Sequence, residues 1–196
     1  MNKSKPSDSL KVVSVTPLEE NPDFKVPKGK AWVGDPCYIL GMEPFWQELC
    51  EKTFERRGSR YEFKYSDGYV VKLMVDGKPH EVMFCGTAFG DGSYPVFVDG
   101  IEMGTAGVDS GTLSIIPLDL AKTLQEIYVK GNSFDAGVKV SIAKSEMPWA
   151  DNGNFGTSNL EVITEGEDDE DEDVSEDDYD DEDDDEEAES DFDDDE

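Results

Sequence analysis

The sequence predicts an α+β domain, mainly antiparallel β-sheet with two helices, followed by a disordered acidic C-terminal tail. Three observations lead to this fold class. Asp-Gly pairs separate short β-prone segments, two segments have helical periodicity, and the composition changes abruptly after Thr164. We therefore expect a flexible leader over residues 1–9, a single globular domain over 10–164, and a disordered polyacidic tail over 165–196.

The first part of the domain is expected to contain two strands. Leu10–Thr16 is rich in valine, which favours extended structure. Three prolines between residues 17 and 27 then indicate a loop. A short strand over Ala31–Val33 should end at the turn Gly34-Asp35-Pro36.

The clearest helix is predicted over residues 43–54. Pro44 suits the first turn, where its missing N–H group is harmless. Arg56 and Arg57 suit the negative end of the helix, and Gly58 follows as a stop signal. The apolar face consists of Phe45, Trp46, Leu49, Cys50 and Phe54. Such a face should pack against the core.

Residues 61–116 have the pattern of a β-meander. Asp-Gly tolerates the positive φ angles of tight hairpin turns, and four such pairs occur, beginning at Asp67, Asp76, Asp91 and Asp99. The β-prone runs around them are Tyr61–Tyr65, Tyr69–Val75, Glu81–Thr87 and Tyr94–Val98. Consecutive hairpins of this kind would form one continuous antiparallel sheet.

The remainder of the domain should supply the second helix and the last strands. Residues 117–128 place Leu120, Leu124 and Ile127 on one stripe of a helix. Val138–Ala143 and Leu160–Ile163 are typical of closing strands. Asp151–Ser158 has the composition of a loop, and we expect it to be the hinge between domain and tail.

The charge of the protein is concentrated in the tail. The chain has 196 residues, 48 acidic and 17 basic, and a formal net charge of −31. Residues 165–196 hold 25 of the acids and no Lys or Arg, so the rest of the chain carries only −6. This balance disfavours direct binding to nucleic acid or to an anionic membrane, because both require positive surface. No apolar run approaches the roughly 20 residues of a membrane span.

The cysteines indicate a reducing compartment. Cys37, Cys50 and Cys85 are odd in number and form no C-x-x-C pair, so reduced thiols in a cytoplasmic protein are expected. Cys37 with His80 would be a thiol nucleophile and base, and with Cys85 they would instead contribute to a zinc site. Neither arrangement has a diagnostic spacing, and we predict no cofactor.

The glycine-rich segment Gly86–Tyr94 is the most unusual part of the domain. Its backbone N–H groups could converge on an anion, although it matches neither a dinucleotide fingerprint nor a P-loop. A hairpin with special turn geometry is the structural alternative. Ser110 lies beside Asp109, but a turn explains that pair better than a nucleophile does, since no G-x-S-x-G elbow surrounds it.

Carboxylates in glycine-containing turns form the candidate ligand or ion site. If the sheet brought these turns together, the carboxylates of Asp35, Asp91 and Asp109 could bind a divalent cation or perform acid–base chemistry. Turn preference also explains each Asp separately. The full candidate set is Asp35, Cys37, Gly90, Asp91, Gly92, Asp109 and Ser110. The metal, if any, is not specified by this pattern.

Short motifs in the central half of the chain resemble a set found in small phage and bacterial proteins with no established activity. The motifs are Gly34-Asp-Pro-Cys-Tyr38, the segment Gly86–Tyr94, and Gly107-Val-Asp-Ser-Gly111 followed by Ile115-Ile-Pro117. The similarity extends over about residues 31–117 and excludes the acidic tail. The resemblance implies a small cytoplasmic protein, which would act in the host cytoplasm if a phage encodes it.

The tail has the charge density of a nucleic-acid strand. Fully extended at roughly 3.3–3.6 Å per residue, it would carry one charge about every 4–5 Å. Single-stranded nucleic acid carries one about every 3.4 Å. Two aromatic rings could stack or fill an apolar pocket on a partner. The residues expected to contact a partner are Asp168, Asp169, Asp171, Asp177, Asp178, Tyr179, Asp183, Asp184, Asp185, Phe192 and Asp193.

These observations favour a non-enzymatic interaction protein whose polyanionic tail engages a basic protein surface, as a mimic or decoy of nucleic acid. A nucleic-acid-handling or defence protein is the expected kind of partner. One alternative is a small enzyme or ligand- or metal-binding domain that uses the turns around Asp35, Cys37, Asp91 and Asp109. Another is a single-stranded-DNA-binding protein with an acidic regulatory tail, which would need a basic groove in the domain. A purely solubilising tail is the simplest reading.

Overall fold

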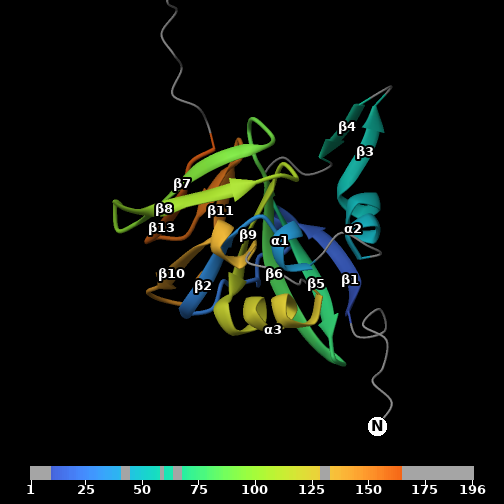
Figure 1. Ribbon diagram of the computed structural model, residues 1–196, viewed down its shortest axis with the longest axis horizontal. Coiled ribbons are helices and arrows are strands. Elements are labelled where there is room, and N and C mark those ends of the chain that lie inside the picture. The colour runs from blue at the N-terminus through green and yellow to red at the C-terminus, as the bar shows by residue number, and fades with distance from the viewer. Residues whose placement is uncertain (1–9, 41–44, 58–59, 64–67, 129–132, 165–196) are drawn as a thin grey trace, which may run out of the picture. The chain divides into compact units, whose positions relative to one another are not determined.

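The protein has the predicted α+β fold, mainly antiparallel sheet (Figure 1). The computed structural model describes residues 10–40, 45–57, 60–63, 68–128 and 133–164. The leader and the acidic tail expected at the two ends lie outside these residues. Every strand pair in the described part is antiparallel.

A six-stranded sheet forms the centre of the domain. Its order is β1 (Leu10–Pro17), β5 (Tyr69–Val75), β6 (Lys78–Gly86), β9 (Thr112–Pro117), β2 (Gly29–Gly34) and β10 (Val138–Ile142). Several strands have continuous apolar runs rather than an alternating pattern, because both faces of this sheet are covered. Val70 and Val71, for example, point to opposite faces, and both are buried.

A second, five-stranded sheet has the order β11 (Trp149–Asp151), β12 (Asn154–Gly156), β13 (Leu160–Val162), β7 (Gly92–Val98) and β8 (Ile101–Val108). The continuous meander predicted for residues 61–116 is therefore wrong. After β6 the chain leaves the central sheet, forms the β7–β8 hairpin, and returns as β9 beside β6. Strands β6 and β9 bury residues on both faces, because the second sheet covers one face and the helices cover the other.

The Asp-Gly pairs behave in two ways. Asp76-Gly77 and Asp99-Gly100 have positive φ at both residues (48° and 76°, 51° and 76°) and close the β5–β6 and β7–β8 hairpins, as predicted. Asp91-Gly92 instead ends the connection between the two sheets. Asp67 lies outside the described residues.

The prediction of a loop over residues 151–158 is wrong. Asn152 (φ 49°) and Gly153 (φ 87°) form a tight turn that joins β11 to β12, and β12 pairs in turn with β13. An Asn-Gly pair has the same tolerance of positive φ as Asp-Gly, so the segment contains a hairpin where its polar composition indicated a hinge.

Both predicted helices are present within the predicted ranges, together with one further short helix. The helices are α1 (Cys37–Leu40), which was not predicted, α2 (Phe45–Thr53) and α3 (Leu118–Tyr128), with 3₁₀ turns at Leu18–Glu20 and Ser133–Ala136. Arg56 and Arg57 do not end the helix as expected. They belong to β3 (Phe54–Arg57), which pairs with β4 (Arg60–Phe63). No helix in the described part is long and apolar enough to cross a membrane.

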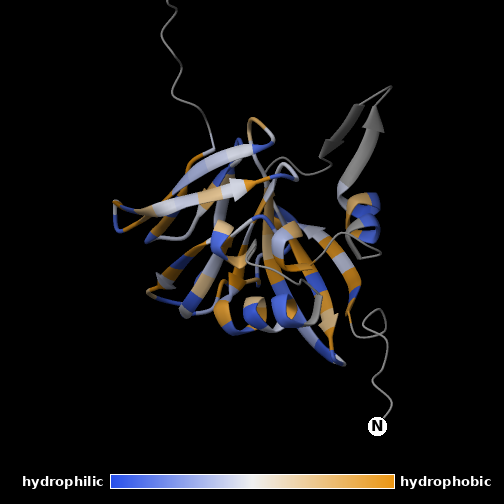
Figure 2. Ribbon diagram, viewed as in Figure 1, coloured by the Kyte–Doolittle hydropathy of each residue, from blue (hydrophilic) through white to orange (hydrophobic). Residues whose placement is uncertain are grey.

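Two apolar cores lie on the two sides of the central sheet. Between the sheets, Val70, Met83 and Ile115 pack with Val96, Phe155 and Val162 of the second sheet. On the other side, α1, α2 and α3 contribute Ile39, Leu49 and Leu124 to a core with Trp32, Val71 and Phe84. Figure 2 shows the corresponding hydrophobic stretches on the central strands and on one side of α3. The domain thus has three layers, which are the helices, the six-stranded sheet and the five-stranded sheet.

Candidate functional site

The turns that carry the sequence motifs meet at one place, and the carboxylate of Asp35 joins them. Asp35 is fully buried. Its Oδ1 accepts hydrogen bonds from Cys37 N (2.8 Å) and Ser110 Oγ (2.7 Å), and its Oδ2 accepts from Asp109 N (2.8 Å) and Ser110 N (2.7 Å). The turn after β2 is therefore bonded to the β8–β9 turn, which is more than 70 residues away in the sequence.

The glycine-rich loop after β6 completes this turn cluster, which comprises residues 34–38, 86–92 and 107–111. Asp91 Oδ1 accepts a hydrogen bond from Gly111 N (3.1 Å). Thr87 donates from its backbone N to Gly111 O (3.0 Å) and from Oγ1 to Gly90 O (2.6 Å). Gly90 has φ +84°, a conformation that residues with a side chain rarely adopt.

The chemistry of the turn cluster is that of a structural clamp. The hydrogen bonds of Asp35 all come from the protein's own turns, so this carboxylate is engaged in holding the motifs together. Burial and then the negative charge of Asp35 raise the pKa of the Cys37 thiol far above its ordinary value. Burial and a hydrogen bond to Asp109 likewise raise the pKa of Tyr38. A protonated thiol is a poor nucleophile.

The other candidate residues are not brought to this cluster in the same way. His80 lies six residues before Gly86 on β6, which corresponds to about 20 Å of extended strand, so the Cys37–His80 pair is not formed. The thiol of Cys85 is buried and donates to Gly86 O (3.4 Å) and Gly153 O (3.7 Å). Among the described residues, no group of three His, Cys, Asp or Glu side chains is arranged to hold a metal ion.

The expected partner-binding residues, from Asp168 to Asp193, lie outside the described residues. The residue that precedes the acidic segment is nevertheless well anchored. Thr164 is fully buried, donates from its backbone N to Asn154 Oδ1 (2.7 Å), and accepts at Oγ1 from Ala88 N (2.9 Å). The acidic segment therefore follows in sequence from a point fixed to the glycine-rich loop.

A pocket on the outer face of the second sheet was not predicted from the sequence. Its volume is about 420 Å³, within the usual range of ligand sites. Trp149, Phe97, Asp99 and Glu161 line it, together with the β12–β13 connection. The register explains the grouping, because Trp149 pairs with Gly156, Gly156 with Glu161, and Glu161 with Phe97. Since directly paired residues share a face, these positions form one row.

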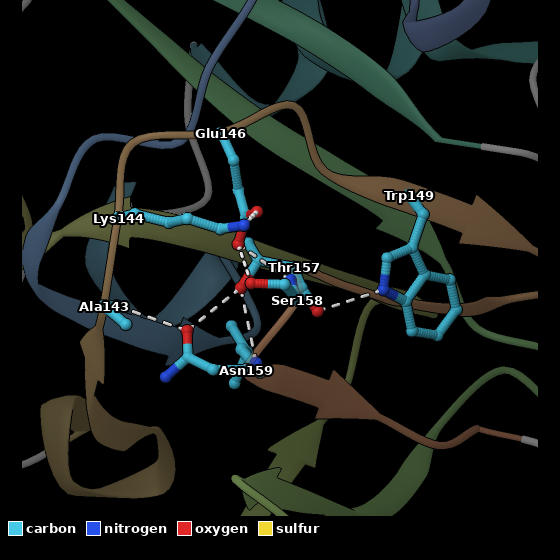
Figure 3. Close-up of polar contacts among 8 residues, drawn as sticks. Ala143, Lys144, Glu146, Trp149, Thr157, Ser158 and Asn159 are labelled. Atoms are coloured by element: carbon cyan, nitrogen blue, oxygen red, sulfur yellow. Dashed lines mark hydrogen bonds and ion pairs between the residues drawn. The ribbon is translucent and has the colours of Figure 1, made fainter.

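Hydrogen bonds of the β12–β13 connection fix one wall of this pocket (Figure 3). Trp149 Nε1 donates to Thr157 O (3.2 Å), which orients the indole. Asn159 Oδ1 accepts from Ala143 N (3.2 Å), and Asn159 O accepts from Asp99 N (2.8 Å). The connection is thereby held both to the segment after β10 and to the β7–β8 turn.

Glu146 holds the same connection from the other side. It accepts from Ser158 N (2.8 Å) and Ser158 Oγ (2.6 Å), and Lys144 Nζ lies 3.0 Å from its second carboxylate oxygen, as Figure 3 shows. The hydrogen bonds from Ser158, and to a smaller extent Lys144, lower the pKa of Glu146 to about 2. Glu146 is thus ionised, and the positive charge of Lys144 balances its negative charge.

The sequence contains little that could have revealed this pocket. Its aromatic residues, Phe97 and Trp149, are 52 positions apart and come from different hairpins. The turn-cluster residues, in contrast, were recognisable as motifs, and the structure does place them together. No protein-family model matches the chain, and no curated protein or solved structure is similar to it.

Proposed function

We propose that this protein is a non-enzymatic interaction protein of the cytoplasm whose polyanionic tail engages a basic protein surface, in the manner of a nucleic-acid decoy. The observation that carries the proposal is the separation of charge. Of the net charge of −31, all but −6 belongs to residues 165–196. Such a segment attracts basic surfaces over long distances and repels nucleic acid itself.

The chemistry of the turn cluster supports a binding role over an enzymatic one. The buried carboxylate of Asp35 is occupied by backbone and hydroxyl donors, and the thiol of Cys37 has a raised pKa. A nucleophilic cysteine requires the opposite shift. The motifs that suggested an active site are thus accounted for as the element that joins three turns.

A partner that handles nucleic acid fits the charge spacing of the tail. Proteins that bind single strands present a positively charged groove with aromatic side chains. A chain with one carboxylate about every 4–5 Å when extended, and with Tyr179 and Phe192 available for stacking, would occupy such a groove. The resemblance to phage proteins suggests a host nucleic-acid-handling or defence protein.

Affinity capture from nuclease-treated lysate tests the proposal. Three baits are compared at about 0.1 M and 0.5 M salt, where the screening length falls from about 10 Å to about 4 Å. They are the full chain, a chain ending at Thr164, and a full-length variant in which every tail Asp and Glu becomes Asn or Gln. A basic partner recovered by the full chain alone, and lost at 0.5 M salt, is the expected result. Equal recovery by all three baits would refute the role of the tail.

A further inference from the structure

We propose that the pocket beside Trp149 is a binding site for a guanidinium group, supplied by an arginine side chain of a basic protein. The site belongs to the folded domain and not to the tail. Only the source of the arginine rests on the proposed function. The pocket's preference for a cation follows from the residues that line it.

The first argument is the composition of the row across the second sheet. Trp149, Glu161 and Phe97 occupy neighbouring strands in paired positions, with Gly156 between the first two. A Cβ at Gly156 would collide with Leu160 O, so the backbone of the β12–β13 connection, and no side chain, lies between the indole of Trp149 and Glu161. Asp99 lies in the β7–β8 turn, two residues after Phe97, and also lines the pocket. Aromatic and acidic groups thus alternate around the pocket.

The second argument is electrostatic. Asp99 and Glu161 are exposed carboxylates, and among the described residues neither forms an ion pair. Lys144, the nearby cation, is engaged by Glu146 at 3.0 Å. The lining of the pocket therefore contains two negative charges and no positive one. A cationic ligand would neutralise them, whereas an anion would be repelled.

The third argument concerns shape. Trp149 is 38% exposed and its ring edge is fixed by the hydrogen bond from Nε1 to Thr157 O, so one face of the indole is held as a platform. A guanidinium is planar, stacks on aromatic rings, and forms paired hydrogen bonds with carboxylates. An ammonium group has the charge but not the planar shape. We therefore assign the pocket to arginine in preference to lysine.

NMR titration of the full chain tests the assignment through the indole N–H signal of Trp149. The probe is N-acetyl-arginine amide, and N-acetyl-citrulline amide is its uncharged counterpart of nearly the same shape. N-acetyl-lysine amide and maltose are the further comparisons. The Trp149→Phe variant identifies the signal. We expect a saturable shift of this signal with the arginine probe at millimolar concentration, a weaker one with lysine, and none with citrulline or maltose.

Substitutions in and beside the pocket separate it from the tail. Glu161→Gln and Asp99→Asn should each weaken binding of the arginine probe at least threefold. Glu102→Gln is the matched control, because Glu102 continues the same row beyond Phe97 but does not line the pocket. The proposal would be overturned if the citrulline probe shifted the Trp149 signal as much as the arginine probe, or if maltose shifted it at all. Unchanged binding of the arginine probe in Glu161→Gln would overturn it as well. Perturbation of tail signals alone would also overturn it, while leaving the proposed function of the tail intact.

Discussion

Replacement of Asp35 should reveal how much stability the turn cluster contributes. In Asp35→Ala, three backbone N–H groups and the Ser110 hydroxyl lose their acceptor. A hydrogen bond to a charged group contributes about 1.5–3 kcal/mol, and a buried donor left unpaired costs about 1–3 kcal/mol. These contributions overlap, so we expect the free energy of unfolding to fall by about 4–6 kcal/mol for this variant.

Asp35→Asn gives a sharper test because it keeps the shape of the side chain. An amide oxygen placed at the Oδ2 position can still accept from Asp109 N and Ser110 N. The amide nitrogen then faces Cys37 N–H, whose bond is lost, while the Ser110 hydroxyl can reverse its role and accept. We expect a loss of about 2–3 kcal/mol, and about 1–1.5 kcal/mol for Ser110→Ala, which removes one bond only.

Urea denaturation monitored by tryptophan fluorescence measures these differences. Asp99→Asn is the matched control, because Asn tolerates the positive φ of that exposed turn, and its effect should stay within about 0.5 kcal/mol. The order Ser110→Ala, Asp35→Asn, Asp35→Ala is the essential result. An Asp35→Asn variant as stable as the wild-type protein would refute the clamp. Should Asp35→Ala fail to fold, the other two variants still decide the question.

Three further predictions concern other parts of the domain. The raised pKa of the Cys37 thiol predicts slow alkylation by iodoacetamide at pH 8 in the native protein; rapid native labelling of this residue, followed by mass spectrometry, would contradict the assigned environment. The pKa of Glu146 is lowered from 4.5 in the unfolded chain to about 2 in the folded protein. Ionised Glu146 therefore stabilises the fold fully at pH values above 4.5, and this stabilisation is lost as the pH falls toward 2. Wild-type protein and Glu146→Gln should therefore differ in denaturant midpoint at pH 7 and converge near pH 2, and carboxyl NMR titration should show a higher pKa for Glu146 in Ser158→Ala. Gly137→Ala would place a Cβ 2.2 Å from the buried Trp32 ring, so it should cost about 1–3 kcal/mol of unfolding free energy by the same urea assay, and a neutral effect would contradict the packing.

Local signals in the sequence were sufficient for the elements but not for their partners. Asp76-Gly77 and Asp99-Gly100 predicted two hairpins correctly because the turn conformation depends on the residues of the turn itself. The third pair, Asp91-Gly92, has the same local signature, yet it ends the connection between two sheets. What distinguishes it is the contact of Asp91 with Gly111, which is 20 residues away. Distant contacts of this kind leave no periodic trace in the sequence.

The covering of the central sheet on both faces could have been suspected from the apolar runs in its strands. Strand β6 contains the unbroken apolar run Val82–Cys85, and β9 contains Leu113, Ile115 and Ile116 with only Ser114 between them. An antiparallel sheet with one face in solvent would show alternation instead. The candidate site was predicted as a set of residues, whereas the engagement of Asp35 by its neighbours could not be, since spacing does not reveal which donors surround a carboxylate. The Trp149 pocket depends on the register of four strands, and residue spacing does not reveal that register either, so the sequence did not predict the pocket.

The position of β2 in the central sheet has a consequence for how the chain is made. Ala31 pairs with Pro117 on one side and with Val140 on the other, partners that are 86 and 109 residues later in the chain. While β5–β6 and β7–β8 can close as soon as their turns exist, β2 must wait until almost the whole domain has been synthesised. Loop closure over such separations is slow. A nascent chain that ends before β10 would present an open, apolar strand edge, so interrupted synthesis is expected to yield aggregation instead of a partial domain.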